Sequence, residues 1–232
     1  MIFHGFQKMT LLDYPGRVAC TLFTAGCNFR CPFCHNASLV TSVSGDDTYT
    51  EEEVLAFLRK RRGLLDGVCF TGGEPLMQPD IAPFMEQVKA LGYAIKLDTN
   101  GTSPDKLAAL IDAGLVDYVA MDVKNSHEKY AATAGCDAGL LPAVERSIDL
   151  LLEGKVDYEF RTTVVDQLHT PDDIGAIARR IAGAPRYFLQ AFVDSGDILG
   201  ADTYGAPDAQ TLHRMRERAA VFVPNTELRG TE

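Results

Sequence analysis

The stretch VACTLFTAGCNFRCPFC, residues 18–34, starts as an apolar run and ends in a cluster of three cysteines. Residues 18–26 have the β-branched and aromatic content of a buried strand. Cys27, Cys31 and Cys34 follow at once, separated by three and by two residues. A closed structural zinc site uses four protein ligands. Three clustered cysteines therefore imply either a fourth ligand elsewhere or a coordination position left open for chemistry.

Similar apolar runs recur along the chain, and each predicts a buried strand. They lie at residues 67–73, 94–101, 117–124, 158–165 and 186–193. Helix signals separate them, beginning with the capping-box pattern of Thr50 and Glu53. Ser103 and Thr170 are the predicted N-caps of two later helices. Helices are predicted over residues 50–63, 79–92, 103–114, 139–153, 170–183 and 206–220, and a polar loop over 35–50.

Strands that alternate with helices predict parallel strands joined by crossovers. Six such units in 232 residues are too few for a closed barrel of eight, which takes about 250 residues. We predict an α/β fold, an open partial (β/α)6 barrel of parallel strands with outer helices. A flat doubly wound sheet has the same alternation and remains the alternative. Because no linker-like stretch divides the chain, residues 1–232 are predicted to form one domain.

The composition is that of an ordinary globular protein, with 46% hydrophobic and 23% charged residues. The formal net charge of −10 argues against a nucleic-acid partner. No apolar run approaches the ~20 residues that a membrane-spanning helix needs, and the N-terminal sequence has no signal-peptide pattern. We therefore predict a cytoplasmic protein with no membrane partner.

The cysteines fall into different kinds. In a reducing cytoplasm, clustered cysteines are metal ligands or catalytic thiols more often than disulfides. Cys20 and Cys69 lie in apolar runs, where a free cysteine behaves as a small buried hydrophobic residue. Cys136 lies in a glycine-rich segment and is predicted to be an ordinary loop thiol. The cluster fits zinc or an iron–sulfur centre, and a zinc site would need His35, His4 or Cys136 as its fourth ligand.

Polar residues stand at the carboxyl ends of the predicted strands. TGGEP (Thr71–Pro75) follows the second strand, and DTNG (Asp98–Gly101) follows the third. The later strands carry Asp122, Lys124, Arg161 and Gln190. The carboxyl ends of parallel strands meet on one face, where α/β proteins bind ligands. Since buried polar groups need partners, one shared ligand explains this set more easily than separate pairings.

Two motifs in this arrangement resemble those of one family. CNFRCPFC, residues 27–34, with Phe33 before its last cysteine, is similar to the signature of radical S-adenosylmethionine (SAM) enzymes. GGEP, Gly72–Pro75, at the end of the second predicted strand, is similar to the family's second element. The resemblance covers about residues 17–193, with 194–232 as a C-terminal extension. It implies the partial barrel rather than the doubly wound sheet.

The resemblance also implies a role for each site residue. Cys27, Cys31 and Cys34 would each hold one iron of a [4Fe-4S] cluster whose fourth iron chelates SAM. Gly72 and Gly73 would allow close approach of the methionine moiety. The other implied roles are Glu74 as acceptor for the SAM ammonium group, Phe33 beside the adenine, Asp98, Asn100, Asp122 and Lys124 at the ribose, the carboxylate or a bound monovalent cation, and Arg161 and Gln190 as further candidates. The alternative for Lys124 and Arg161 is a salt bridge to a neighbouring aspartate.

The chemistry implied by this family comes from its cofactors rather than from a side-chain base. The reduced cluster would pass one electron to the sulfonium of SAM, methionine would leave, and a 5′-deoxyadenosyl radical would abstract a hydrogen atom. A one-electron donor such as flavodoxin or ferredoxin is therefore an implied partner.

The N-terminal stretch resembles one particular group within this family. Residues 5–36, GFQKMTLLDYPGRVACTLFTAGCNFRCPFCHN, resemble the N-terminus of the glycyl-radical-enzyme activases. Within that group they are most similar to the activating proteins of anaerobic ribonucleoside-triphosphate reductase, with pyruvate formate-lyase activating enzymes as close relatives. DYPG, Asp13–Gly16, predicts a turn before the first strand. The implied function is abstraction of a hydrogen from a glycine of a partner enzyme.

Two other functions stay open at this point. The first is a radical SAM enzyme that acts on a small molecule, for example in modified-base biosynthesis. The second is a cysteine-zinc module without enzymatic activity. The GGEP motif argues against this second function, because a zinc module does not account for it.

Overall fold

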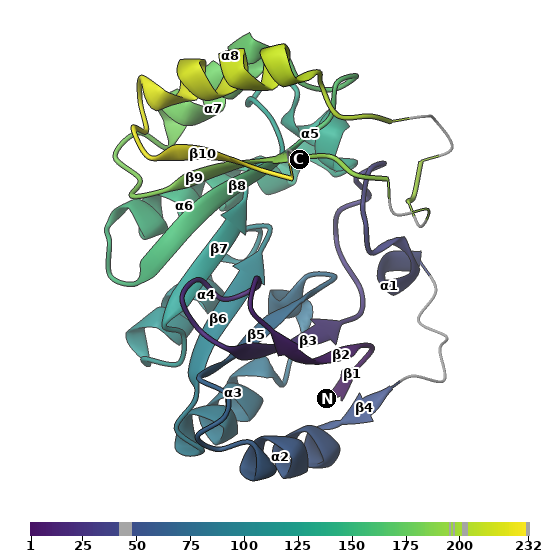
Figure 1. Ribbon diagram of the computed structural model, residues 1–232, viewed down its shortest axis with the longest axis vertical. Helices are drawn as coiled ribbons and strands as arrows, with labels where there is room; N and C mark the ends of the chain where they lie inside the picture. Colours follow the sequence, from purple (N-terminus) through teal and green to yellow (C-terminus); the bar gives the residue numbers. More distant parts are fainter. Residues whose placement is uncertain (42–47, 195, 197, 201–203, 231–232) are drawn as a thin grey trace.

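The computed structural model describes residues 1–41, 48–194, 196, 198–200 and 204–230. Its centre is an eight-stranded sheet with the order β10-β9-β8-β7-β6-β5-β3-β2 (Figure 1). These strands are β2 (Phe6–Thr10), β3 (Ala19–Thr24), β5 (Gly67–Gly72), β6 (Ala94–Thr99), β7 (Tyr118–Asp122), β8 (Asp157–Val164), β9 (Tyr187–Ala191) and β10 (Thr226–Arg229). Neighbouring strands pair in parallel, except that β2 pairs antiparallel with β3.

The strand order distinguishes the two predicted architectures. From β3 to β10, each new strand lies on the same side of the one before it. A doubly wound sheet instead reverses its order at a switch point and carries helices on both faces. Here the longer helices that connect the strands lie along the outer side of a curved sheet (Figure 1). The open partial (β/α)6 barrel is therefore confirmed, with β3, β5, β6, β7, β8 and β9 as the six predicted parallel strands and β10 added in parallel to β9.

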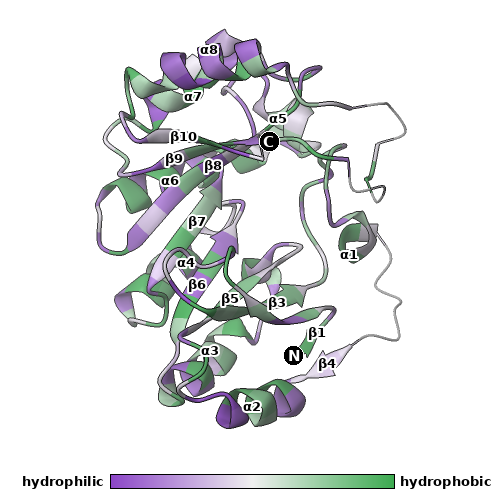
Figure 2. Cartoon of the chain, in the orientation of Figure 1, coloured by the Kyte–Doolittle hydropathy of each residue, from purple (hydrophilic) through white to green (hydrophobic). Residues whose placement is uncertain are grey.

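The outer helices pack through apolar faces. They are α2 (Glu51–Lys60), α3 (Ile81–Ala90), α4 (Pro104–Asp112), α6 (Leu141–Leu152), α7 (Pro171–Arg180) and α8 (Ala209–Ala220). In α6, Val144, Ile148 and Leu151 recur at helical spacing and are buried. They belong to the same hydrophobic cluster as the strand residues Leu97 and Phe160. Figure 2 shows β3 and β5 as hydrophobic and much of α8 as hydrophilic, as expected for core strands and an outer helix.

The three predicted N-caps are correct in position, with one difference in chemistry, while α3, α6 and α8 begin two or three residues after their predicted starts at 79, 139 and 206. Thr50 caps α2 in a capping box with Glu53, and Thr170 caps α7 in the same way with Asp173. Ser103 occupies the N-cap position of α4, but its side chain makes no capping hydrogen bond. Pro104 starts that helix with its φ already suited to helix.

The structure has elements that the sequence pattern does not predict. The prediction of a loop over residues 35–50 is wrong in part, because this stretch contains α1 (Ala37–Thr41) and β4 (Tyr49–Thr50); residues 42–47 lie outside the described residues. β4 pairs with β1 (Ile2–Phe3). β2 escapes prediction because it is an edge strand with Gln7, Lys8 and Met9 exposed, so it lacks an apolar run. α5 (Tyr130–Ala134) is also unpredicted, being too short for a periodic signal.

The DYPG motif closes the end of the barrel opposite the cysteines. Its turn is confirmed, since the Arg17 backbone N–H donates to the Tyr14 carbonyl oxygen at 3.1 Å. Tyr14 is buried beside Ala19, Cys69 and Tyr118, and its ring centroid lies 6.0 Å from that of Tyr118. Ala19 and Tyr118 are the first residues of β3 and β7. Tyr14 therefore packs at the amino ends of the strands.

Beyond β9, the helix and last strand of the C-terminal part are α8 and β10. Within the part of the chain that the structure describes, no helix combines the length and the apolar character needed to cross a bilayer.

Candidate active site

One pocket lies where the cysteine loop after β3 meets the carboxyl ends of the parallel strands. Every residue predicted to bind the cluster or SAM lines it: Cys27, Cys31, Phe33, Cys34, Gly72, Gly73, Glu74, Asp98, Asn100, Asp122, Lys124, Arg161 and Gln190. The possible zinc ligands His4 and Cys136 do not line it. His35, Asn36, Thr99 and Thr163 also contribute to its wall. The shared location follows from the fold, because parallel strands present all their carboxyl ends on one face.

Side-chain alternation explains how charged residues occupy apolar strands. In β6, Leu97 is fully buried in the hydrophobic cluster, while the neighbouring Asp98 lines the pocket. In β8, Phe160 is fully buried and Arg161 lines the pocket. Successive side chains of a strand point to opposite faces. The outer face of the sheet thus takes apolar residues, and the inner face can take charges.

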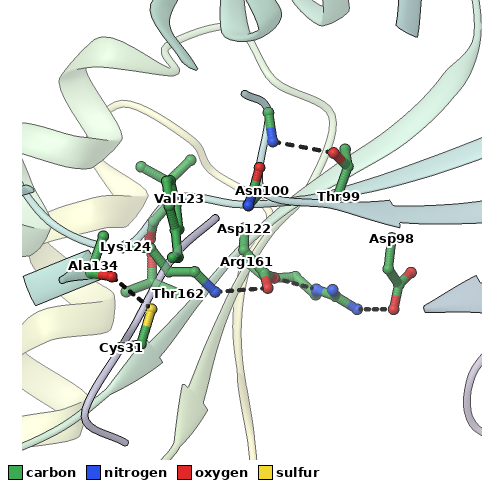
Figure 3. Close-up of polar contacts among 12 residues, drawn as sticks. Cys31, Asp98, Thr99, Asn100, Asp122, Val123, Lys124, Ala134, Arg161 and Thr162 are labelled. Atoms are coloured by element: carbon green, nitrogen blue, oxygen red, sulfur yellow. Dashed lines mark hydrogen bonds and ion pairs between the residues drawn. The ribbon is translucent and has the colours of Figure 1, made fainter. Parts of the chain in front are cut away.

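A buried ion network forms the floor of the pocket. Arg161 donates from Nε to Asp122 Oδ1 at 2.9 Å and from Nη1 to Asp98 Oδ2 at 3.2 Å, and Lys124 Nζ donates to Asp122 Oδ2 at 2.9 Å (Figure 3). Lys96, which is only 2% exposed, donates to Asp98 Oδ1. Burial, the largest single effect, would raise the pKa of both carboxyls, but Arg161 together with Lys96 at Asp98 and with Lys124 at Asp122 outweighs it, and both pKa values lie below the ordinary one. The alternative predicted for Lys124 and Arg161, a salt bridge to an aspartate, is confirmed.

This network does not fit the predicted monovalent cation. Each oxygen of the Asp98 and Asp122 carboxylates already accepts a hydrogen bond from a lysine or from Arg161. Three cationic side chains surround two carboxylates, which leaves a net positive charge. An added anionic or neutral group is better accommodated beside this network than an added cation.

Glu74 is a buried carboxyl that joins β5 to β6. It is 1% exposed. It accepts hydrogen bonds from Thr99 Oγ1 at 2.8 Å, from the Asn100 backbone N–H at 2.7 Å and from the Leu76 backbone N–H at 3.2 Å. Burial raises its pKa to about 7, although these donors act in the opposite direction. A cation bound beside Glu74 would favour its ionised form.

The glycines of GGEP are required by the packing of the chain itself. A Cβ at Gly73 would lie 2.7 Å from the carbonyl carbon of Gly26, in the loop that leads to the cysteines. A Cβ at Gly72 would lie 2.6 Å from the backbone nitrogen of Thr24, and Gly72 also has a φ of 110°. The glycines therefore let the end of β5 pack against the end of β3.

The cysteine loop is held by backbone and side-chain contacts. Cys31 Sγ lies 3.4 Å from the carbonyl oxygen of Ala134 in α5. Cys27 Sγ accepts from the Phe29 backbone N–H at 3.4 Å. Burial raises the pKa of Cys31 to about 12 and also raises the pKa of Cys27. A metal that binds these sulfurs must therefore displace their protons.

The other three cysteines lie in the surroundings that their sequence context predicts. Cys20 and Cys69 are 0% and 1% exposed and act as core residues. Cys136 follows the end of α5 and is absent from the residues that line the pocket. Thus Cys136 is not placed as a fourth ligand beside Cys27, Cys31 and Cys34.

Several residues of the site were not singled out by sequence reasoning. Lys96 could have been found, because a lysine inside the apolar run AIKLDT requires a buried partner. Thr163 could have been found by strand alternation from Arg161. Asn28 and Thr102 carry no such signal, since polar residues in loops are ordinary. Their hydrogen bonds to each other and to Asn100 become visible only in the folded chain.

The chain combines a partial barrel with a polar pocket that three cysteines help to line. This combination is typical of enzymes that bind a metal-containing cofactor. Residues 21–181 match the family model of the Radical SAM superfamily, and the chain belongs to that superfamily. The family implies a [4Fe-4S] cluster and SAM as cofactors.

Individual relatives are of more than one kind. A protein of Methanocaldococcus jannaschii named "Putative glycyl-radical enzyme activating enzyme" is 32% identical over 195 residues, which cover 81% of this chain and 78% of the relative. A 7-carboxy-7-deazaguanine synthase of Thermoplasma acidophilum is 28% identical over 193 residues, which cover 78% of this chain and 87% of the relative. A solved domain of pyruvate-formate lyase-activating enzyme from Bacteroides vulgatus aligns with a TM-score of 0.55 and 16% identity, over 71% of this chain and 99% of that one.

The residues present fit the cofactors of the family. Among the described residues, no group of three or more His, Cys, Asp or Glu side chains is arranged to hold a metal ion. Cys27, Cys31 and Cys34 instead line one end of a pocket. A cluster of several irons is larger than one ion and takes thiolate ligands from around its surface. The pocket beside the thiols, with Glu74 and the cationic floor, has the polar groups that an amino acid cofactor needs.

Proposed function

We propose that this protein is a glycyl-radical-enzyme activating enzyme whose partner is the anaerobic ribonucleoside-triphosphate reductase. The observation that carries the proposal is one pocket lined both by the three cysteines of the signature and by Gly72, Gly73 and Glu74 of GGEP. The N-terminal resemblance and the name of the M. jannaschii relative support the activase assignment. When bound, the cluster and SAM supply a radical that abstracts hydrogen.

Different residues of the pocket would bind the cluster and the different parts of SAM. Cys27, Cys31 and Cys34 hold the cluster, and Glu74 accepts from the SAM ammonium group. The backbone around Gly72 and Gly73 borders the methionine moiety, and Phe33 packs beside the adenine. The net positive floor around Lys124 and Arg161 suits the ribose hydroxyls or the SAM carboxylate, and it keeps Asp98 and Asp122 ionised.

The part of the pocket formed by β8 and β9 is suited to a peptide. Thr163 and Gln190 are Cα partners across β8 and β9, and both line the pocket. Among the described residues, neither the Thr163 hydroxyl nor the Gln190 amide has a hydrogen-bond partner within the protein. Neutral donors and acceptors of this kind match the backbone groups of a protein segment. The proposed substrate is accordingly a glycine in a loop of the partner enzyme.

A second candidate is a radical SAM enzyme that acts on a small molecule. The similarity to a 7-carboxy-7-deazaguanine synthase covers most of both chains. The net positive floor of the pocket would also accept a substrate that carries a carboxylate. This candidate needs no protein partner.

Electron paramagnetic resonance under anaerobic conditions tests the proposal. The protein would be reconstituted with iron and sulfide and then mixed with a flavodoxin or ferredoxin donor, SAM and an anaerobic ribonucleotide reductase. A glycyl-radical doublet that is absent without SAM is the expected result. If 5′-deoxyadenosine forms without a doublet, the reductase is not the partner, and pyruvate formate-lyase is tested next. If neither glycyl-radical enzyme responds, the small-molecule function replaces the activase.

A further inference from the structure

The side chain of Asn100 connects the cysteine loop with the loop after β6. Its Nδ2 lies 3.8 Å from Cys27 Sγ and 2.8 Å from Asn28 Oδ1. Its Oδ1 accepts from the Thr102 backbone N–H at 3.0 Å and from Thr102 Oγ1 at 2.7 Å. The Asn28 amide in turn donates to Thr102 Oγ1 at 2.8 Å. These contacts form a closed hydrogen-bonded set.

The partners of Asn100 determine the orientation of its amide. The Thr102 backbone N–H can only donate, so the oxygen of Asn100 must face Thr102. The NH₂ group must then face Cys27 and Asn28. Because Asn100 is only 6% exposed and both ends of its amide are engaged, its side chain is not available to the ribose, the carboxylate or a cation, the roles predicted from the sequence.

We propose that Asn100 is a positioning residue that donates a hydrogen bond to the Cys27 sulfur and raises the reduction potential of the cluster held there. This inference rests on the proposed function in assuming a cluster on Cys27. Hydrogen bonds to ligand sulfurs are among the factors that set iron–sulfur potentials. Reduction adds one negative charge, and a donor at the sulfur stabilises the more negative state.

The backbone of the same residue holds the other end of the cofactor site. The Asn100 N–H donates to Glu74 Oε2 at 2.7 Å, and the preceding Thr99 hydroxyl donates to Glu74 Oε1 at 2.8 Å. One short turn thus holds the sulfur of a cluster ligand and the carboxyl proposed for the SAM ammonium group.

Potentiometric titration of the reconstituted cluster, followed by electron paramagnetic resonance, tests the inference without measuring turnover. Asn100→Leu removes the donor, and Asn100→Asp keeps the shape but places a carboxylate against the sulfur. Thr102→Val leaves Asn100 in place and keeps the backbone N–H that orients its amide, but removes the hydroxyl that donates to Asn100 Oδ1 and accepts from Asn28. Asn225→Leu is the matched control, because the Asn225 amide donates to the Pro185 carbonyl oxygen at 3.1 Å and lies outside the pocket. Thermal unfolding of each cluster-free variant reports its folding.

The expected result is a cluster that is harder to reduce in both Asn100 variants, more so in Asn100→Asp, and a smaller shift in Thr102→Val. A tenfold change in the ratio of oxidised to reduced cluster, 59 mV for one electron, is the scale expected for one charge-assisted hydrogen bond. Asn225→Leu should match the parent protein.

Three results would overturn the inference, and they are distinguishable. If the parent protein assembles a cluster and the folded Asn100 variants keep its potential, the inference is wrong and the proposed function stands. If the parent protein assembles no cluster, both the proposed function and the inference are wrong. Equal shifts in Asn100→Leu and Asn225→Leu would also count against a specific bond to Cys27.

Discussion

Arg161 Nε lies 2.9 Å from Asp122 Oδ1 in the interior of the barrel, with 13% of the arginine side chain exposed. The same guanidinium reaches Asp98 at 3.2 Å. Removing one member of a buried ion pair leaves an uncompensated charge. The stability of the buried ion network that forms the floor of the pocket therefore depends on Arg161.

Replacing Arg161 by methionine should destabilise the protein by about 3–5 kcal/mol near neutral pH. The pKa values of Asp98 and Asp122 are lowered in the folded state. Their contribution to stability is thus present above the unfolded pKa of about 3.9 and lost as the pH falls through the folded values. The difference between parent and Arg161→Met should shrink at strongly acidic pH, as measured by urea unfolding at several pH values.

The matched control is Arg146→Met. Arg146 pairs with Asp105, and the two side chains are 61% and 83% exposed. An exposed pair of this kind contributes about 0–1 kcal/mol. A similar loss in both variants would mean that Arg161 does not have the special role assigned to it.

Glu74→Gln should remove a pH dependence of stability. The folded pKa of Glu74 is raised to about 7 from an ordinary 4.5, so the folded state binds more protons than the unfolded state between these values. The free energy of unfolding of the parent should therefore fall with rising pH over this window, relative to the variant. Urea unfolding from about pH 4 to about pH 8 measures the difference. Parallel curves for the two proteins would show that Glu74 is not perturbed.

SAM binding should depend on the same carboxyl if Glu74 accepts from the ammonium group. A bound cation favours ionised Glu74, so affinity should rise with pH up to about 7, by at most tenfold per pH unit. Isothermal titration of the reconstituted parent and of Glu74→Gln measures this. An equal slope in both proteins would assign the ammonium group to another acceptor.

Gly73→Ala should disturb the cysteine loop. The new Cβ would lie 2.7 Å from the carbonyl carbon of Gly26, and overpacking against rigid backbone costs about 1–3 kcal/mol or more. Iron content after reconstitution should fall with it. Gly205→Ala is the control, because no atom lies within 4 Å of a Cβ at Gly205. Normal iron content in Gly73→Ala would show that the loop can move aside without loss.

Cys31→Ala should remove a cluster ligand and abolish cleavage of SAM, with 5′-deoxyadenosine as the measured product. Cys20→Ala removes a core thiol outside the pocket and should keep cleavage, with a modest loss of stability from the cavity. Formation of 5′-deoxyadenosine by Cys31→Ala would contradict the ligand assignment.

Tyr14→Ala should act on stability rather than on the site. Tyr14 is 2% exposed and packs at the amino ends of the strands, so the loss should be about 3–5 kcal/mol, as for other large aromatic residues. Leu12→Ala, at an 89% exposed position, should change stability by less than about 0.5 kcal/mol. Thermal unfolding measures both. Equal losses of stability in the two variants would mean that the packing of Tyr14 at the amino ends of the strands does not stabilise the protein.

Much of the fold could be predicted because its signals are local. The alternation of apolar strands with capped helices predicts the parallel crossovers, and Thr50 and Thr170 cap their helices as expected. β2 could not be predicted, because three consecutive exposed residues, Gln7, Lys8 and Met9, leave it with neither an apolar run nor an alternating pattern. Ser103 has the sequence of a cap without its hydrogen bond, since Pro104 already suits the first turn.

The candidate site was predictable in location and less so in its contacts. Asp98 and Asp122 stand at or next to the carboxyl ends of β6 and β7, Arg161 pairs with Asp122 in the neighbouring β8, and parallel strands present those ends together. The use of Asn100 was not predictable, because its orientation depends on Thr102 and on a cysteine 73 residues earlier in the chain.

The sequence by itself determined the order of strands and helices, the spacing of the three cysteines and the face on which polar residues gather. These properties depend on backbone periodicity and on neighbours in the chain. Only the tertiary structure decided which cation pairs with which carboxylate, why Gly73 must lack a side chain and where the Asn100 amide points. Those contacts join distant segments, as Asp98 and Arg161 do across 63 residues, and they exist only once the sheet has curved and brought its strand ends around one pocket.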